Sequence, residues 1–389
     1  MDVARLTSSL VRIRSENPPG STADLIAFIA EFLDSLGVKN RIVSRPGGRD
    51  NLVTTEADPR LLLCGHVDVV PAIPDEWTHD PYSGEVADGY VWGRGTTDMK
   101  GGCAALLVAY QDLIESGVEP KAQFAFVADE ETGGEHGIRS LLAQDLLTPR
   151  DCLIAEPTPE MSPAVGQKGL YRVDISFRGR PGHSSLYPLV GKSAVMAAVD
   201  LIDYLREVHA HRFPAGKDLQ PLVEQSARVF SDVFGIEGGD EILTRVMFNP
   251  GRIEGGEKAN IVAEQCRMEL DVRVPWGCSL EGLRKGIAEH APDATIRETD
   301  VAEPTLTPPD ARIVRTVCRE VERVYGRPAV PFLQWAASDA KYLRDEGFDV
   351  VEYGPGEIPT LHAVDERVRV EQLKKTVDVY RGVIRAYSS

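Results

Sequence analysis

The chain has 389 residues, enough for two or three domains, and its 42% hydrophobic and 26% charged content is ordinary for a soluble globular protein. The formal net charge of -17 argues against nucleic acid or an anionic membrane surface as a partner. The N-terminus lacks a secretory signal pattern, and no apolar run reaches the about 18 residues of a membrane span. The six cysteines form no Cys-X-X-Cys pair, so we expect reduced, buried thiols in a cytoplasmic protein.

Strands and helices alternate in the first part of the chain. Helical apolar spacing covers 1–15 and 22–37, with a break at Asn17-Pro18-Pro19-Gly20. Strand patterns follow within 43–53 and at 61–70, 121–129 and 151–155, and helical patterns lie at 103–115 and near 137–147. This alternation predicts an α/β domain with a mostly parallel sheet flanked by helices.

The pattern changes after about residue 166. Period-two alternation predicts a strand at 171–179, and further elements are a helix at 193–207, strands at 245–251 and 259–274, a helix at 280–290 and a strand at 294–298. Strand, helix, two strands, helix and strand is the order of a ferredoxin-like sandwich. Residues 209–241 have weak periodicity, and we assign no element to them.

The α/β character returns after Glu303-Pro304. Helices are predicted at 309–325, near 338–346 and at 371–386, and a strand at 349–353. We therefore predict one α/β domain built from residues 1–166 and 301–389, interrupted by an inserted α+β domain at 167–300.

Histidine and acidic side chains recur where the predicted strands end. They are His66 and Asp68, the Glu130-Glu131 pair, Glu156 and His362, together with Asp98 in a glycine-rich turn before a helix. Sites in open α/β sheets form at the carboxyl ends of strands, and imidazole and carboxylate groups suit zinc and similar metals. Each residue alone has a plainer explanation, such as a core histidine or a helix cap. Their coincidence predicts a metal site with a carboxylate base.

Short motifs throughout the chain carry a family resemblance. They lie at 65–71 (GHVDVVP), 93–102 (GRGTTDMKGG), 129–133 (DEETG), 155–158 (AEPT), 179–185 (GRPGHSS), 258–262 (KANIV), 271–273 (DVR), 338–340 (SDA) and 361–366 (LHAVDE). With these motifs in this order, the sequence resembles the zinc-dependent amidohydrolases that include acetylornithine deacetylase, succinyl-diaminopimelate desuccinylase and glutamate-releasing carboxypeptidases.

The resemblance implies two zinc ions per subunit, for which cobalt or manganese could substitute. The implied ligands are His66 and Glu156 for one ion, Glu131 and His362 for the other, and Asp98 as the bridge between them. By the same resemblance, Asp68 would orient His66 through its other ring nitrogen. Glu130 would be the general base that takes a proton from a water held between the metals.

The resemblance also implies that the inserted domain is a lid and dimerisation domain. His183 would meet the developing oxyanion in the site of the other subunit of a homodimer. Asn260, Arg273 and Ser338 would bind substrate, with Arg273 either holding a substrate carboxylate or forming a surface salt bridge.

The implied activity is cleavage of the amide bond of an N-acyl amino acid, with acetylornithine-like and succinyl-diaminopimelate-like substrates as the leading options. The alternatives are a dipeptidase or carboxypeptidase with the same site, an N-carbamoyl amino acid amidohydrolase, and a catalytically silent relative that binds a ligand. Two departures leave the acyl group open. Trp335-Ala336-Ala337 stands where relatives that remove succinyl groups often have Gly-Gly-Thr, and the segment 209–241 is longer than the resemblance predicts.

Overall fold

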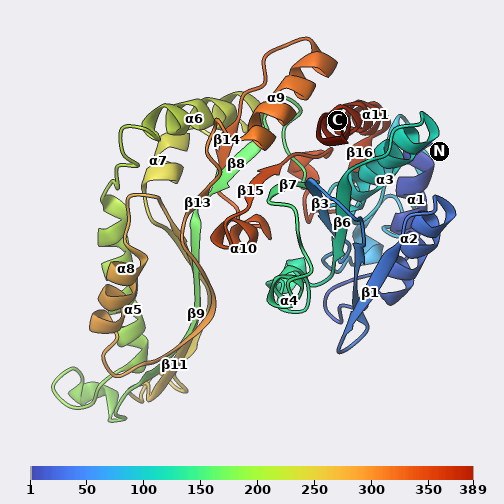
Figure 1. The fold of residues 1–389 in the computed structure, drawn as a ribbon. Helices are drawn as coiled ribbons and strands as arrows, with labels where there is room; N and C mark the ends of the chain where they lie inside the picture. Colours follow the sequence, from blue (N-terminus) through green and yellow to red (C-terminus); the bar gives the residue numbers. More distant parts are fainter. Residues whose placement is uncertain (1, 389) are drawn as a thin grey trace. The chain divides into compact units, whose positions relative to one another are not determined.

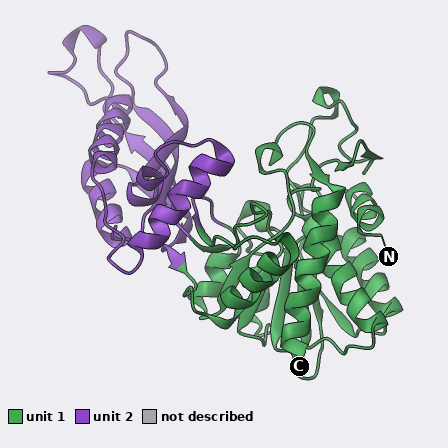
Figure 2. Cartoon of the chain, turned by 90° about the horizontal axis from the view of Figure 1, so that it is seen from above, with its two compact units in different colours: residues 1–166, 306–332, 338–389 green, residues 167–305, 333–337 purple. Residues whose placement is uncertain are grey.

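The computed structural model describes residues 2–388, which divide into two compact units (Figure 2). The main unit comprises the chain up to Gly166, Leu306–Phe332 and the residues from Ser338 onward. The inserted unit comprises Gln167–Thr305 and also Leu333–Ala337, a short segment that the sequence analysis had grouped with the last part of the main domain.

The main unit is built on a large mixed sheet (Figure 1). Its strands run in the order β1-β2-β6-β3-β7-β15-β8-β13, and β14 pairs with β8. The strand bounds are β1 (Asn40–Arg45), β2 (Arg49–Thr54), β3 (Leu61–His66), β6 (Ala122–Val127), β7 (Asp151–Ile154), β8 (Ala164–Gln167), β13 (Thr305–Leu306), β14 (Phe332–Gln334) and β15 (Asp349–Glu352). The central strands β6, β3, β7 and β15 are mutually parallel. Each residue of β3 and β6 is buried, which explains why these strands read as continuous apolar runs.

Helices lie on both sides of this sheet (Figure 1). They are α1 (Val3–Arg12), α2 (Ala23–Ser35), α3 (Lys100–Glu115), α4 (Ile138–Ala143), α9 (Arg312–Tyr325), α10 (Ala340–Asp345) and α11 (Val370–Ser388). A separate small sheet pairs β4 (Val86–Ala87), β5 (Tyr90–Trp92) and β16 (Arg367–Arg369). Helix α3 is almost entirely buried because it packs against α1, α11 and β3. The predicted mostly parallel sheet flanked by helices is confirmed.

The inserted unit is an antiparallel sheet with strand order β10-β11-β9-β12 and helices α5 and α8 packed on its core. The bounds are β9 (Gly169–Arg178), α5 (Ala194–Ala210), β10 (Met247–Gly255), β11 (Gln265–Val274), α8 (Leu280–His290) and β12 (Thr295–Ala302). In β9, alternate residues from Tyr171 to Phe177 are buried in this core. This confirms the ferredoxin-like arrangement.

The unassigned segment 209–241 contains two helices, α6 (Gln220–Phe234) and α7 (Gly239–Thr244). The buried stripe of α6 includes a polar residue, Ser226, whose hydroxyl donates to Leu222 O and accepts from Leu333 N at 2.9 Å. The apolar residues Val223, Val229 and Phe230 lie at helical spacing on the buried face, so the unassigned segment does carry a helical signal in its sequence. The ring of Trp335 packs edge-on against Phe230 and Phe234 of α6. The two departures noted in the sequence therefore contact each other.

Candidate metal centre

Near the carboxyl ends of the parallel strands lies one group of side chains that could hold a metal ion. His66 is the last residue of β3, and Glu156 follows β7. The Nε2 atom of His66 lies 2.9 Å from Asp98 Oδ1 and 3.7 Å from Glu156 Oε1. His66, Asp98 and Glu156 thus present three ligand atoms to one point.

Asp98 also belongs to a second group. Its other carboxylate oxygen, Oδ2, lies 3.2 Å from His362 Nε2, and that nitrogen lies 3.3 Å from Glu131 Oε2. Within each group the ligand atoms all lie within 4.8 Å of one another. The structure therefore brings together the five residues predicted as metal ligands, with Asp98 shared between the two groups.

Asp98 reaches this position from outside the central sheet, because it lies in the turn between β5 of the small sheet and helix α3. Two glycines allow α3 to approach the strand ends. A Cβ atom on Gly65 would lie 2.7 Å from Cys103 Sγ of α3, and one on Gly102 would lie 2.2 Å from Ala155 O. Because neither position has room for a side chain, the start of α3 lies close to the residues next to His66 and Glu156.

Asp68 supports the centre in two ways. The Nδ1 atom of His66 lies 2.9 Å from the backbone oxygen of Asp68 and 3.6 Å from its carboxylate. The carboxylate itself accepts from the backbone N–H groups of Glu130 and Glu131 at 3.2 and 3.3 Å, and from the side-chain amide of Asn17 at 2.9 Å. Asp68 therefore connects the end of β3 to the short 3-10 helix Glu130–Thr132.

The carboxylates and histidines of the centre shift one another's pKa values. Burial raises the pKa values of Glu130 and Glu156 well above the usual range, and neighbouring carboxylates raise them further. Hydrogen bonds donated to Asp98 and Glu131 raise the pKa of His362 to about 10. Burial lowers the pKa of His66, but its hydrogen bonds with Asp68 and Asp98 outweigh this and raise the pKa well above its usual value.

This donor set fits a pair of metal cations. Several carboxyl groups crowd into a buried space, where only a strong positive charge would keep them all ionised. The buried Oε1 atom of Glu131 has no hydrogen-bond partner in the described chain, as expected of an oxygen available for a metal. Imidazole nitrogen and carboxylate oxygen are ligands that zinc accepts.

The predicted base, Glu130, differs from its neighbour Glu131. Of the residues that the structure describes, Glu131 belongs to one of the two candidate metal-binding groups, whereas Glu130 belongs to neither group. Both lie in the same short helix, with their backbone N–H groups held by Asp68. The two adjacent acids are therefore suited to different tasks.

The predicted substrate residues of the inserted unit lie in two places. His183 and Asn260 are on neighbouring loops, since Ser184 N donates to Asn260 O at 3.2 Å and His183 pairs with Ile261 as an isolated β-bridge. Arg273 lies near the end of β11, where its guanidinium binds both carboxylate oxygens of Asp271, at 2.7 and 3.1 Å.

Ser338 is buried in the main unit, and its hydroxyl is already engaged. It donates to Glu352 Oε1 at 2.5 Å and accepts from Ala340 N at 3.1 Å. Glu352 also pairs with the buried Arg344 at 3.1 Å. A substrate contact through Ser338 stays a prediction, and its hydroxyl would have to share this network.

The sequence analysis gave no role to three buried residues that support the centre. Asn17 binds the Asp68 carboxylate, and Arg94 and Glu366 pair with each other. Arg94 and Glu366 both lie inside motifs that carried the family resemblance, which is the signal that could have identified them. For Asn17 the only signal in the sequence is its position at the start of the proline-rich break between two predicted helices.

Comparison with known proteins identifies the family to which the chain belongs. The model of peptidase family M20/M25/M40 matches residues 62–386. The chain belongs to this family. A succinyl-diaminopimelate desuccinylase of Cereibacter sphaeroides strain KD131 is 31% identical, covering 100% of this chain and 99% of the relative. The predicted resemblance is thereby confirmed, and the chain is a hydrolase of amide bonds.

Solved structures of M20 members share the fold. A metallo-carboxypeptidase of Sulfolobus solfataricus has a TM-score of 0.83 and 18% identity, covering 100% of this chain and 99% of that one. The Bacillus subtilis YXEP protein, described as a dinuclear metal binding peptidase, has a TM-score of 0.66 and 13% identity, covering 99% and 97%. The M20/M25/M40 family is metal-dependent and acts on amino acid derivatives or peptides. Along the described part of this chain, every helix is too short or too polar to span a membrane.

Metal binding by this chain should release protons. With its pKa raised to about 10, the His362 ring is protonated at pH 7 in the metal-free protein, and it must lose a proton to bind a metal. The apparent metal affinity should therefore rise with pH between 6 and 8, by about tenfold per pH unit for each proton displaced. Titration calorimetry in buffers of different ionisation enthalpy counts the protons. A metal affinity that does not change with pH would contradict the protonation of His362 at pH 7.

Proposed function

We propose that the chain is a dizinc hydrolase that cleaves the amide bond of an N-acyl amino acid. The observation that carries the proposal is Asp98, whose two carboxylate oxygens face two different histidines, each with a further carboxylate beside it. Such a ligand set suits two cations that share one carboxylate. The desuccinylase relative at 31% identity supports an N-succinyl amino acid as the substrate class.

The main unit would supply ligands and a base. His66 and Glu156 would hold one zinc ion, Glu131 and His362 the other, and Asp98 would bind both. Bound zinc would polarise the scissile carbonyl and lower the pKa of the attacking water.

Glu130 would accept the proton of that water and pass it to the leaving amine. Its carboxylate lies outside both metal groups of the described chain, and its backbone N–H is fixed by Asp68. The neighbouring cations would keep this carboxylate ionised, although burial alone raises its pKa.

The inserted unit would act as a lid whose ends serve two different active sites. Asn260 precedes β11 and Arg273 lies near its end, so most of the strand separates them. At about 3.4 Å per residue, such a strand spans about 30 Å, far more than an amino acid derivative can bridge. His183 lies on the loop beside Asn260. One substrate could therefore contact Arg273 from one subunit and the His183 loop only from another.

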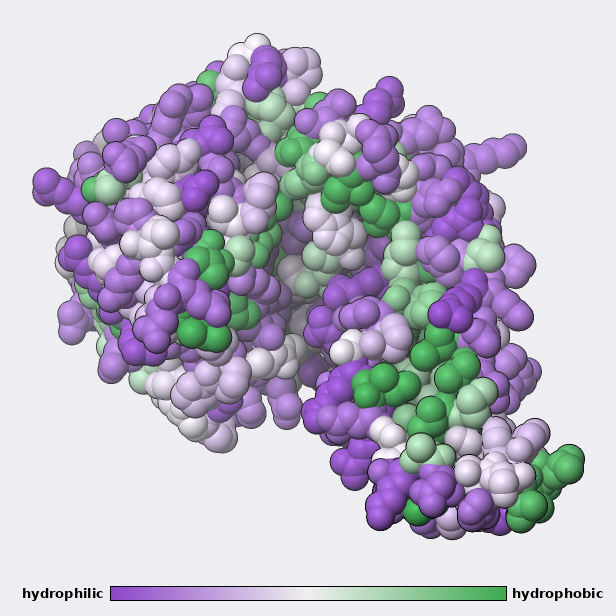
Figure 3. All heavy atoms as spheres, turned by 180° about the vertical axis from the view of Figure 1, so that it is seen from behind, coloured by the Kyte–Doolittle hydropathy of each residue, from purple (hydrophilic) through white to green (hydrophobic). Residues whose placement is uncertain are grey.

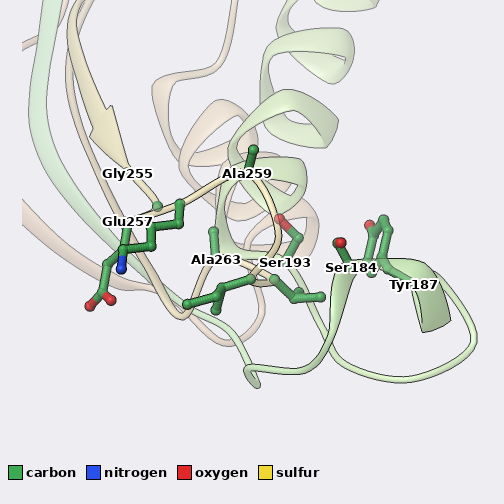
Figure 4. A pocket seen from close by; sticks show the side chains of 11 residues that line it. Ser184, Tyr187, Ser193, Gly255, Glu257, Ala259 and Ala263 are labelled. Atoms are coloured by element: carbon green, nitrogen blue, oxygen red, sulfur yellow. The ribbon is translucent and has the colours of Figure 1, made fainter.

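A homodimer would supply this second loop. The surface around His183 carries exposed apolar side chains at Leu186, Tyr187, Leu189 and Val190, with Leu189 94% exposed. Figure 3 shows hydrophobic groups on the surface of the inserted unit, including its end at the lower right. Beside them, the loops that contain Ser184 and Glu257 line a hollow of about 450 Å³. Figure 4 shows the side chains that line it. Apolar surface of this kind is typical of a protein contact.

Mixing two inactive variants tests the shared site. His183→Ala should lower turnover by about 10²–10³-fold, the usual loss for an oxyanion donor. Mixed with Glu130→Gln, it should regain about a quarter of the wild-type rate, because half of the dimers then contain one complete site. Differently tagged subunits and native mass spectrometry would establish that exchange occurs. Exchange without any recovery of activity would contradict a site shared across a dimer.

The proposed reaction is tested by amine release from N-succinyl, N-acetyl and N-carbamoyl amino acids and dipeptides, each with zinc or cobalt and with a chelator control. Chelator-sensitive release from one acyl class is the expected result. Release from dipeptides alone would replace the proposal by a peptidase. No release from any of them, in protein shown to contain metal, would favour a catalytically silent binding protein.

A further inference from the structure

A buried ion pair lies next to the metal centre in the main unit. The side chains of Arg94 and Glu366 are 4% and 0% exposed, and Arg94 Nη1 lies 2.5 Å from Glu366 Oε2. The other oxygen, Oε1, accepts from three backbone N–H groups of the same turn, those of Gly95, Thr97 and Asp98, at 3.0, 2.9 and 3.0 Å. One carboxylate thus fixes the turn that presents Asp98.

The same pair reaches the segment that presents His362. Arg94 Nη2 donates to the backbone oxygen of His362 at 3.3 Å. Two further bonds join the segments, from Gly93 N to Glu366 O at 2.8 Å and from Thr97 Oγ1 to Arg367 O at 2.7 Å. Residues about 270 positions apart in sequence are therefore held in one hydrogen-bonded unit.

His362 needs such support more than the other ligands do. Its backbone has a φ of 56°, a conformation that is unfavourable for a non-glycine residue, and its side chain is 51% exposed. By contrast, His66 ends a fully buried strand and its side chain is 1% exposed. Packing and the hydrogen bond to Asp68 O hold His66, whereas the exposed His362 depends on bonds to its own segment.

We infer that Glu366, together with Arg94, is a positioning residue that assembles the metal position formed by Asp98, Glu131 and His362. The inference rests on the proposed dizinc function. A carboxylate is required because one oxygen of Glu366 must accept hydrogen bonds from the backbone while the other accepts a hydrogen bond from the Arg94 guanidinium. Burying this charge pair is costly, so replacing one member leaves its partner uncompensated and releases both segments.

The two metal positions should respond differently when the pair is broken. His66 and Glu156 are held by β3 and the end of β7, and neither forms a hydrogen bond or ion pair with Glu366 in the described chain. Asp98 and His362 both depend on the pair. The loss of metal affinity should therefore be larger at the second position, where two of three ligands depend on the pair, than at the first, where only Asp98 does.

The test is a Co²⁺ titration of chelator-stripped protein, followed by absorption and by metal analysis of the isolated protein. Wild type should bind two ions per chain. Glu366→Gln should bind the second ion about 10–100-fold more weakly, the range typical of residues that orient ligands, and the first ion with a distinctly smaller loss, because only one of its ligands, Asp98, depends on the pair.

Glu320→Gln is the matched control. Glu320 is also a buried glutamate of the main unit, paired with Arg323 at 2.6 Å and Arg319 at 3.2 Å, but it lies in α9. This variant should bind both ions as wild type does. Arg94→Lys is the second test variant, because lysine keeps the charge but cannot donate to Glu366 and to His362 O through one planar fork. Arg94→Lys should also lower the affinity for the second ion, and it serves as the test if Glu366→Gln fails to fold.

Wild-type affinity for both ions in these two variants would overturn the inference and leave the dizinc proposal standing. An equal loss at both positions would also overturn it, since the pair would then support the whole fold. Wild-type protein that binds fewer than two ions would instead overturn the proposed function.

Discussion

Glu130→Gln should lower turnover by about 10²–10⁴-fold, the usual contribution of a general base, while the metal content remains that of wild type. The amide has the size of the carboxylate but cannot take a proton from water. The backbone N–H that Asp68 holds is unchanged by the substitution. Metal should be retained because Glu130 belongs to neither metal group of the described residues. Metal analysis and steady-state rates on the same sample measure both effects.

Glu135→Gln is the control for this experiment. Glu135 is an exposed acid a few residues along the same loop and also lies outside both groups of the described chain. It should change neither rate nor metal content. Turnover close to wild type in Glu130→Gln would remove Glu130 as the base. Loss of metal together with turnover would instead make it a ligand.

His362→Ala should reduce the metal content from two ions to one and lower turnover by more than about 100-fold, beyond the range typical of residues that only orient ligands. The imidazole Nε2 faces both Asp98 and Glu131, so its removal leaves the second position with carboxylate oxygens alone. The His66 position should retain its ion, since its side chains are placed by other elements. Elemental analysis after dialysis against a weak chelator measures the loss.

His290→Ala provides the comparison. This residue lies in the inserted unit, donates from its ring to Gly286 O at 2.8 Å and stacks on Tyr204, so the variant removes an imidazole without touching the centre. It should bind two ions. If His362→Ala also binds two ions as tightly as wild type, His362 is not a ligand and the dizinc arrangement needs another donor.

The fold class follows from the sequence alone, because the patterns that indicate it are local. Apolar runs such as 61–66 and 122–127 read as buried strands, and the period-two alternation of 171–177 reads as a half-buried strand. The order of elements then specified an α/β unit with a ferredoxin-like insertion. The chain also indicated which histidines and acids converge, since parallel strands bring their carboxyl ends to one edge.

The contacts that hold those side chains in place are visible only in the folded structure. The Asp68 carboxylate binds the backbone of Glu130 and Glu131, although these residues are more than 60 positions away in sequence. Arg273 is paired with Asp271, and Ser338 with Glu352, so both predicted substrate residues already have protein partners.

The physical reason is that a hydrogen bond depends on where two distant segments meet. Glu366 and Asp98 are 268 residues apart in sequence. No local pattern predicts that the Glu366 carboxylate accepts a hydrogen bond from the backbone N–H of Asp98. The buried Ser226 of helix α6 shows the same limit, because its position is explained only by the hydrogen bond that it accepts from Leu333 N. Hydrophobic patterning specifies which faces are buried, whereas pairing across the fold specifies the geometry of the site.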